Sequence, residues 1–282
     1  MIEKIGVVGA GQMGGGIAHV FAQHGFQVVL HDAVEGQVAR ATKRIADNLE
    51  RQAKKGALDR AAIPEILARI TPASDLAALS GCGLAIEAVS EQEALKVEIF
   101  KRLDATLPAG AILASNTSSI PITRLAAATS RPERVIGMHF MNPVPVMGLV
   151  EVIRGLATSD ATFEEVAGLT KRLGKELAVS QDYPGFIVNR ILIPMINEAA
   201  FAVYEGIASP EDVDKGMKLG TNQPMGPLAL ADLIGLDTVL AILRVLHDGF
   251  ADPKYRPCPL LVKLVDAGRL GRKSGRGFHA YA

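Results

Sequence analysis

The sequence feature that most constrains the fold is a glycine-rich stretch near the N-terminus, Gly9-Ala10-Gly11-Gln12-Met13-Gly14. It directly follows the apolar run Ile5-Gly6-Val7-Val8, which predicts a short buried strand, and apolar residues at helical spacing come after it. A G-x-G-x-x-G motif between a strand and a helix is typical of a dinucleotide-binding βαβ unit, because glycines permit the tight turn and the close approach of a pyrophosphate. We therefore predict cofactor contacts from Gly9, Gly11, Gln12, Met13 and Gly14.

Asp32 ends the next predicted strand, Val28 to His31, eighteen residues after Gly14. A carboxylate at about this distance binds the adenosine ribose hydroxyls in such folds. Because it would also repel the extra phosphate of NADP, Asp32 favours NAD as the cofactor. His31 and Arg40 lie nearby and keep NADP open as an alternative, and a turn aspartate without a ligand is another.

Apolar strands then alternate with helices, which predicts a Rossmann-like sheet. The predicted strands are residues 70–73, 83–89 and 111–114. Glu87 lies near the end of the second of these, at the edge of a parallel sheet where ligands bind. It is therefore a candidate cofactor residue, with a simple helix-start charge as the alternative.

Five small polar residues, Ser115 to Ser119, follow the strand at 111–114. Asn116 and Ser118 are candidates to line the cleft and to hydrogen-bond the nicotinamide ribose and the substrate. The alternative is that these side chains only cap a helix that starts at Pro121, with Ser119 as its N-cap.

A histidine and a glutamate, His139 and Glu151, are twelve residues apart on two predicted buried strands. Between them, Asn142-Pro143-Val144-Pro145 cannot continue a strand and must turn, which can bring the two side chains together. An imidazole beside a carboxylate is a general base with a fixed tautomer, suited to removing a proton from a hydroxyl near neutral pH. The alternative is a core histidine beside an incidental glutamate.

Residues 37–57 predict a long helix with an apolar face and an opposite basic stripe that ends in Arg51, Lys54 and Lys55. An ordinary solvated helix face would explain the stripe. The functional alternative is a site for a phosphorylated, acidic ligand such as the nucleotide end of coenzyme A.

Composition limits the classes of partner. Thirty basic and thirty acidic residues cancel, which argues against a nucleic acid or an anionic membrane recognised through bulk charge. No apolar run approaches the roughly 18 residues that a membrane span requires. Cys82 and Cys258 have neither the spacing nor the neighbouring histidines of a metal site, so we expect both to be packing residues. We expect a soluble, cytoplasmic protein that binds no metal.

A domain boundary is predicted at Asp182-Tyr183-Pro184-Gly185, which separates residues 1–183 from residues 184–282. The second segment reads as helices. The predicted fold class is therefore α/β, a Rossmann-like dinucleotide-binding domain followed by an all-α C-terminal domain. The apolar content of these helices exceeds what about a hundred residues bury alone, which predicts a homodimer through this domain. The basic tail Gly271 to Phe278 predicts a flexible segment.

Several motifs occur in one order along the chain. They are the glycine loop, Asp32, Ser115-Asn116-Thr117-Ser118-Ser119, His139-Phe140-Met141-Asn142-Pro143-Val144-Pro145, Glu151 and Pro184-Gly185-Phe186-Ile187-Val188-Asn189-Arg190. Together they resemble the L-3-hydroxyacyl-CoA dehydrogenases, and the layout is most similar to the bacterial 3-hydroxybutyryl-CoA dehydrogenases. The resemblance runs essentially from end to end.

The resemblance implies that the chain interconverts an L-3-hydroxyacyl-CoA and a 3-ketoacyl-CoA with NAD. It makes His139 the catalytic base and Glu151 its partner, and it places Ser118 and Asn189 in contact with the substrate. The family is dimeric through its helical domain, and members contact coenzyme A in the region where the basic helix ends.

For the cofactor, the resemblance implies contacts from Asn142 and Lys273. Family members often have an asparagine after the glutamate that matches Glu91, and here Gln92 takes that place at the expected ribose contact. Two rival readings are a non-catalytic dinucleotide protein and a 6-phosphogluconate-type dehydrogenase. The latter requires a catalytic lysine where this chain has Asn189.

Overall fold

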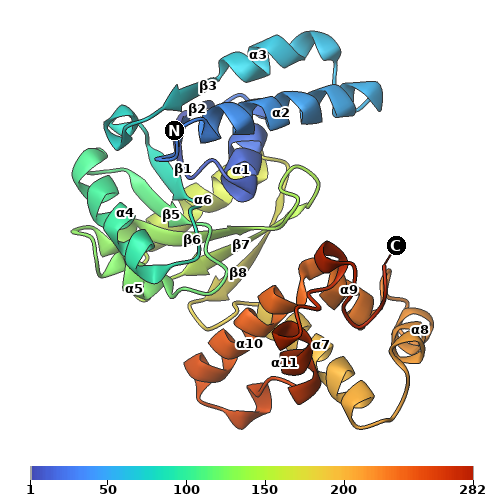
Figure 1. Cartoon of the computed structure of the whole chain (residues 1–282). Helices are drawn as coiled ribbons and strands as arrows, with labels where there is room; N and C mark the ends of the chain where they lie inside the picture. The colour runs from blue at the N-terminus through green and yellow to red at the C-terminus, as the bar shows by residue number, and fades with distance from the viewer. Residues whose placement is uncertain (1, 282) are drawn as a thin grey trace. The chain divides into compact units, whose positions relative to one another are not determined.

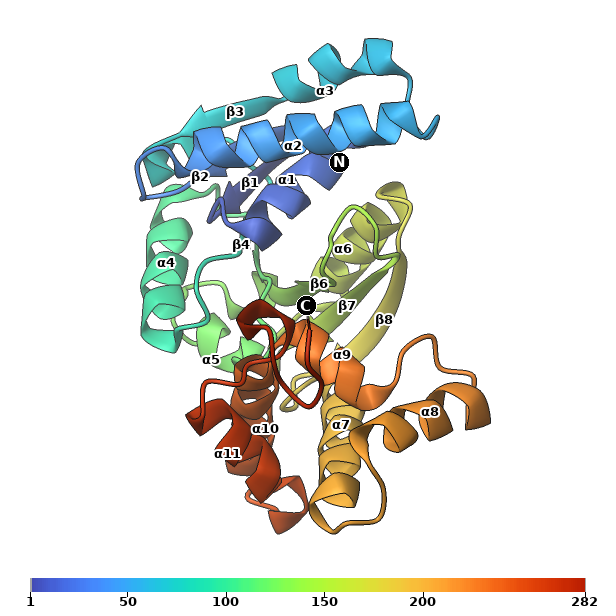
Figure 2. The same cartoon turned by 45° about the vertical axis from the view of Figure 1, so that its right-hand side comes forward.

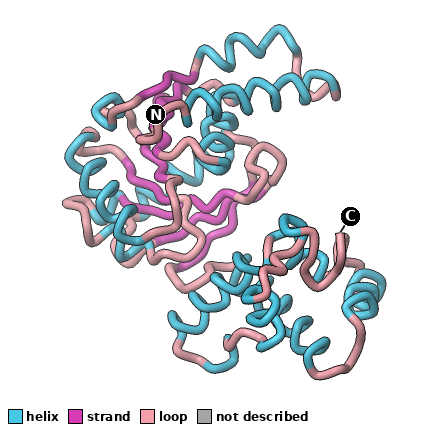
Figure 3. Tube along the Cα trace, viewed as in Figure 1, coloured by secondary structure: helices cyan, strands magenta, loops and turns pink. Residues whose placement is uncertain are grey.

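The computed structural model describes residues 2–281, which form two compact units that divide between Tyr183 and Pro184 (Figure 1). The first unit contains all of the named strands, and the second is built from helices and loops (Figure 3).

A single eight-stranded sheet forms the centre of the first unit, in the order β3-β2-β1-β4-β5-β6-β7-β8. The strands are β1 (Lys4–Val8), β2 (Gln27–His31), β3 (Ile70–Ala73), β4 (Leu84–Glu87), β5 (Ile112–Ser115), β6 (Val135–Phe140), β7 (Leu149–Arg154) and β8 (Glu176–Gln181). All neighbouring strands are parallel except β6 and β7. The order 3-2-1-4-5-6 is that of a doubly wound dinucleotide-binding sheet, so the predicted Rossmann-like fold is confirmed.

Helices cover both faces of this sheet. They are α1 (Gln12–Gln23), α2 (Gln37–Lys54), α3 (Ile63–Ala68), α4 (Glu93–Thr106), α5 (Ile122–Ala126) and α6 (Asp160–Arg172), with short 3₁₀ turns η1 (Arg60–Ala62), η2 (Leu76–Leu79) and η3 (Pro132–Arg134). Helices α1 and α6 share one apolar core with alternate strand residues, whereas α4 and α5 contact β4, β5 and β6. The central strands β4, β5 and β6 are buried along their whole length because both faces are covered. Helices α2 and α3 lie side by side next to β3 (Figures 1 and 2).

The N-terminus of α5 is capped from a distant part of the chain. The alternative reading of the sequence has Ser119 as the N-cap, but Pro121 holds that position, and its side chain has no atom that could accept a hydrogen bond. The Asp182 carboxylate instead accepts from the backbone N–H groups of Ile122, at 2.9 Å, and Thr123, at 2.7 Å. An aspartate supplies the negative charge that a helix N-terminus favours, so the alternative reading of Ser119 as the N-cap is wrong.

The second unit has its own apolar core. Its elements are α7 (Val188–Tyr204), α8 (Pro210–Gly220), α9 (Pro227–Ile234), α10 (Leu236–Phe250) and α11 (Pro259–Asp266), with η4 (Pro253–Tyr255) and η5 (Arg272–Ser274). The tail after α11 is more fixed than its composition predicts. The buried carboxylate of Asp232 accepts from the backbone N–H groups of Phe278 and His279, at 3.0 and 2.9 Å. These bonds tie the segment to α9.

In the part of the chain that the structure describes, no helix combines the length and the apolar character that crossing a bilayer demands.

Candidate active site

The centre of the site is formed by the antiparallel pair β6 and β7. His139 and Glu151 stand directly opposite each other in the register, and side chains that oppose each other across two strands lie on one face of the sheet. The Nδ1 atom of His139 lies 2.7 Å from Oε2 of Glu151. His139 is only 7% exposed and Glu151 is fully buried. The turn therefore brings the two residues together as expected.

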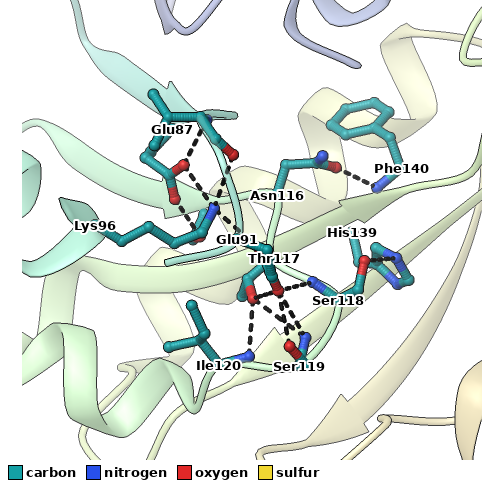
Figure 4. Close-up of polar contacts among 12 residues, drawn as sticks. Glu87, Glu91, Lys96, Asn116, Thr117, Ser118, Ser119, Ile120, His139 and Phe140 are labelled. Atoms are coloured by element: carbon teal, nitrogen blue, oxygen red, sulfur yellow. Dashed lines mark hydrogen bonds and ion pairs between the residues drawn. The ribbon is translucent and has the colours of Figure 1, made fainter. Parts of the chain in front are cut away.

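The other nitrogen of the His139 ring faces the loop that follows β5. Nε2 lies 3.1 Å from Oγ of Ser118 (Figure 4). Because a carboxylate accepts at Nδ1, the neutral ring keeps its proton on Nδ1 and presents the lone pair of Nε2. The ring is thus oriented at both nitrogens, with its basic atom directed at a hydroxyl group.

The loop at 115–121 is held against β6. Oδ1 of Asn116 accepts from the backbone N–H of Phe140 at 2.9 Å, so the amide of Asn116 bridges two neighbouring strand ends. Oγ1 of Thr117 accepts from the backbone N–H of Ile120 at 2.8 Å, which closes a local turn. Together these bonds fix the loop on either side of Ser118.

Glu87, a candidate cofactor residue from its place at a strand end, lies inside the protein. Its side chain has no exposed surface. Its carboxylate binds Nζ of Lys96 at 2.7 Å, the hydroxyl of Ser115 at 2.6 Å and the backbone N–H of Val89 at 2.7 Å. A buried carboxylate requires such partners, and this set accounts for the burial of Glu87.

The acidic side chain that reaches the loop after β5 is Glu91. It accepts hydrogen bonds from Thr117, Ser118 and Ser119, and it pairs with Lys96 at 3.2 Å. Burial opposes ionisation of Glu91, but the Lys96 ammonium and the donors of the loop outweigh it and lower the pKa of the carboxyl. Gln92, the residue expected at the ribose, is exposed and stands at the N-cap of α4.

The glycine loop has the shape that a dinucleotide requires. Gly9 has a φ of 100°, and a Cβ there would lie 2.6 Å from the carbonyl oxygen of Ala88. A Cβ on Gly14 would lie 1.7 Å from the carbonyl oxygen of Gly9, whereas one on Gly11 would meet nothing among the described residues within 4 Å. The backbone at Gly11 is therefore open to a close ligand at the start of α1, where the helix dipole favours a phosphate.

Asp32 lies at the end of β2, beside this loop. Its carboxylate accepts from the backbone N–H groups of Ala10, at 2.7 Å, and Val34, at 2.8 Å. Each carboxylate oxygen can accept more than one bond, so Asp32 both closes the glycine loop and keeps lone pairs for a ribose hydroxyl. The residues present thus fit a dinucleotide.

A pocket of about 430 Å³ lies between the start of α1, one face of α2 from Gln37 to Arg51, and the turn after β6. Nε2 of Gln12 donates to Oδ1 of Asn142 at 3.0 Å across it, and the Asn142–Pro143 peptide bond is cis. Arg44 and Arg51 contribute positive charge to its lining, and Arg44 donates to the carbonyl oxygen of Ala10 at 3.0 Å. The pocket is therefore continuous with the glycine loop and cationic on one side.

The basic residues at the end of α2 differ in their setting. Arg51 lines the pocket and pairs with Asn48, whereas Lys54 and Lys55 are exposed at the helix end. Lys175 holds the turn after β6, because its Nζ donates to the carbonyl oxygens of Val144, at 2.8 Å, and Met147, at 2.6 Å. Burial lowers the pKa of Lys175.

Two further candidates belong to the second unit. Asn189 is the second residue of α7 and is partly buried. Lys273 lies in η5, and its Nζ pairs with the Asp237 carboxylate at 2.6 and 2.7 Å. Burial opposes ionisation of Asp237, but the bonds from Lys273 outweigh it and lower the pKa of the carboxyl.

Sequence reasoning missed Lys96, which is fully buried in α4. A signal was present, because Lys96 stands three, four and seven residues before Ile99, Phe100 and Leu103, the buried residues of the same helix. Those spacings define one helix face. A lysine on an apolar face requires a buried acid nearby.

Comparison with known proteins shows what the chain is similar to. Residues 4–183 match the model of the 3-hydroxyacyl-CoA dehydrogenase NAD binding domain, and residues 185–281 match the C-terminal domain of the same family. A 3-hydroxybutyryl-CoA dehydrogenase of Bradyrhizobium diazoefficiens is 58% identical over 281 residues, covering 100% of this chain and 96% of that protein. The human mitochondrial hydroxyacyl-coenzyme A dehydrogenase is 43% identical over 288 residues, covering 100% and 92%.

A solved structure gives the same result. The crystal structure of (S)-3-hydroxybutyryl-CoA dehydrogenase from Ralstonia eutropha has a TM-score of 0.98 and 52% identity, with 100% of both chains covered. The first unit is accordingly an NAD-binding domain, and NAD is its cofactor. With both units matched in order, the chain belongs to the 3-hydroxyacyl-CoA dehydrogenases, a family of oxidoreductases.

Proposed function

We propose that this chain catalyses the NAD-dependent interconversion of (S)-3-hydroxybutyryl-CoA and acetoacetyl-CoA. The observation that carries the proposal is the His139 ring held between Glu151 and Ser118, at 2.7 and 3.1 Å. The names of the relatives from Bradyrhizobium diazoefficiens and Ralstonia eutropha support this choice of substrate.

In this mechanism, Nε2 of His139 removes the proton of the C3 hydroxyl. A bound NAD would supply the acceptor for the hydride that leaves C3. Glu151 then stabilises the imidazolium that results, and because both side chains are buried, water screens their attraction little. A base positioned in this way supplies roughly 10²- to 10⁴-fold in rate.

Two side chains are proposed to orient the substrate. Ser118 donates to the reacting oxygen, from a position that already lies within hydrogen-bonding distance of Nε2 of His139. Asn189 is assigned to the acyl thioester because it stands in the Pro184–Arg190 motif that resembles the family pattern. Orientation of this kind lowers the activation free energy, because the entropy cost of aligning the reacting groups is already met when the substrate binds.

The cofactor contacts are proposed from the geometry of the first unit and, for Lys273 of the second unit, from the family resemblance. The open backbone at Gly11 and the start of α1, with Gln12 and Met13, would hold the pyrophosphate, and Asp32 the adenosine ribose. Polar side chains at the strand ends and beyond would hold the rest of the dinucleotide: Gln92, Asn116, Ser118, Asn142 and Lys273.

We assign coenzyme A to the basic end of α2. Arg51 lines the 430 Å³ pocket, and the exposed ammonium groups of Lys54 and Lys55 follow within one helical turn. Phosphates of the CoA nucleotide would find positive charge there, and the attraction should weaken with salt.

The second unit is proposed to form a homodimer. Large apolar side chains on its helices remain exposed, among them Ile191 at 67%, Ile207 at 73% and Leu219 at 79%. Apolar surface of this kind supports an interface between copies. Light scattering after size exclusion should give about twice the 29.8 kDa chain mass. A cytoplasmic location is also proposed, supported by the buried free thiols of Cys82 and Cys258.

The test of function is an absorbance assay at the NADH band. Acetoacetyl-CoA and longer 3-ketoacyl-CoA substrates are reduced in parallel with NADH and with NADPH. The proposal expects rapid NADH oxidation with acetoacetyl-CoA and a slower reaction with NADPH. An enzyme that binds NADH but turns over none of these thioesters would refute the substrate class.

A further inference from the structure

Lys175 is a buried cation at the junction between α6 and β8. It is only 8% exposed, and its Nζ donates to the carbonyl oxygens of Val144, at 2.8 Å, and Met147, at 2.6 Å. Burial lowers the pKa of Lys175, and no carboxylate in the described residues 2–281 counteracts that effect. A lysine is almost never buried without a partner. The two carbonyl oxygens, both in the turn after β6, therefore keep the ammonium in this place.

The turn that Lys175 holds joins the two strands of the histidine–glutamate pair. Residues 141–148 connect β6 with β7. The junction before β8 binds this turn a second time, because the backbone N–H of Glu176 donates to the carbonyl oxygen of Gly148 at 2.8 Å. The tip of the turn is exposed, with Val146 at 77%, so packing fixes little of it there. Hydrogen bonds from the junction therefore do much to fix the turn.

The same turn packs closely against α1. Val144 is buried, and a Cβ on Gly16 would lie 2.9 Å from the Cβ of Val144, so the glycine permits this approach. Asn142 lies in the same turn, and its Oδ1 accepts from Nε2 of Gln12, the first residue of α1, at 3.0 Å. The turn is thus held by α1 through its side chains and by Lys175 through its carbonyl oxygens.

The position of Asn142 depends on this support. Val144, which supplies one of the two acceptors, follows Asn142 closely in sequence. Without the ammonium, both carbonyl oxygens would lose their donor, and a buried carbonyl without a donor favours rearrangement toward water. A pocket of about 250 Å³, lined by Lys175 and by residues 145–148, gives the turn space to move. We therefore expect loss of the ammonium to displace Asn142.

We propose that Lys175 is a positioning residue: it holds residues 141–148 against α1, so that Asn142 stands beside Gln12 where it can contact the dinucleotide. Lys175 itself touches neither cofactor nor substrate in this scheme and acts through Asn142. The inference rests on the proposed function, because Asn142 is a cofactor contact only under that proposal.

The test measures the Kd for NADH by titration calorimetry in Lys175→Met, Asn142→Ala and the double variant. Lys175→Met removes the ammonium and keeps an unbranched apolar side chain. It should raise the Kd roughly 5- to 10-fold, as expected for the loss of about one hydrogen bond to the ligand. Since Lys175 acts through Asn142, the double variant should bind little more weakly than Asn142→Ala alone. The matched control is Lys171→Met, which removes the same charge from an exposed position near the end of α6 and should keep the parent Kd.

A second readout needs no ligand. The side-chain NH₂ resonances of Gln12 report its hydrogen bond to Asn142. They should shift in Lys175→Met toward their positions in Asn142→Ala, and Lys171→Met should leave them in place. A loss of stability elsewhere in the protein would not move them.

A further variant covers the case in which Lys175→Met fails to fold. Lys175→Gln keeps an NH₂ group that can donate to a carbonyl oxygen, but it is shorter than lysine and uncharged. It should raise the Kd for NADH less than the loss of all donors does. A Kd equal to that of the parent would overturn the inference in this variant as well.

The outcomes separate the claims. If Lys175→Met lowers only the melting temperature and leaves the Kd for NADH and the Gln12 resonances at their parent values, the positioning role is wrong and the proposed function stands. If the effects of the two single variants multiply, Lys175 acts independently of Asn142 and the inference is overturned. If Asn142→Ala itself leaves the Kd unchanged, the inference falls with that cofactor contact, whereas turnover of acetoacetyl-CoA by the parent decides the proposed function separately.

Discussion

Replacing Glu151 by glutamine removes one charge from a buried pair while keeping the size of the side chain. Nδ1 of His139 and Oε2 of Glu151 are 2.7 Å apart, and neither residue is appreciably exposed. With charge centres about 4 Å apart and an effective dielectric constant of about 20, the attraction for the imidazolium is about 4 kcal/mol. The amide oxygen can still accept from Nδ1, and a hydrogen bond of that kind retains about 1 kcal/mol. The remaining 3 kcal/mol or so corresponds to a loss of about 10²-fold in kcat.

The assay is steady-state oxidation of 3-hydroxybutyryl-CoA, in which His139 becomes charged as the reaction proceeds. Glu151→Gln should lower kcat while the Kd for NADH stays within about threefold, because the dinucleotide is held elsewhere. The double variant with His139→Gln should be little worse than the worse single variant, since the two residues act as one unit. Full kcat in Glu151→Gln, or losses that simply multiply, would show the pair to be a structural coincidence.

Three further variants test other parts of the molecule. Asp32→Ala should weaken NADH binding and reduce the bias against NADPH, and unchanged kinetics with both cofactors would remove Asp32 from the site. Charge removal at Arg51, Lys54 and Lys55 should raise the KM for acetoacetyl-CoA, more at low salt, whereas an equal rise for NADH would indicate lost stability. Burial lowers the pKa of His19 to about 4 from 6.5, so the native state favours the neutral ring and loses stability as the pH falls from about 6.5 to 4. Between pH 6.5 and 4, the free energy of unfolding measured with urea should change less with pH in His19→Gln than in the parent, by at most about 3 kcal/mol. Parallel pH curves for the two proteins would contradict this.

Local patterns in the sequence predicted much of the first unit. A strand, a glycine loop and a helix are contiguous, so their spacing alone predicts the start of the Rossmann-like sheet. The approach of His139 and Glu151 was also accessible, because a short turn between two apolar strands permits only a few registers.

Contacts between distant segments were not predictable in this way. Asp182 caps a helix 60 residues earlier in the sequence, and Glu91 binds a loop 26 to 28 residues later. Such pairs depend on which strands become neighbours, which no local pattern specifies. The same reason explains Glu87, where the strand-end position was correct but the direction of the side chain was set by Lys96, from the next helix.

The most direct test of the central claim is a single comparison of His139→Gln with the parent. Both proteins are measured for the Kd of NADH and for kcat in acetoacetyl-CoA reduction. The account predicts that kcat falls roughly 10²- to 10⁴-fold while the Kd for NADH changes less than about threefold. A variant that keeps the parent kcat would contradict the assignment of His139 as the acid-base residue.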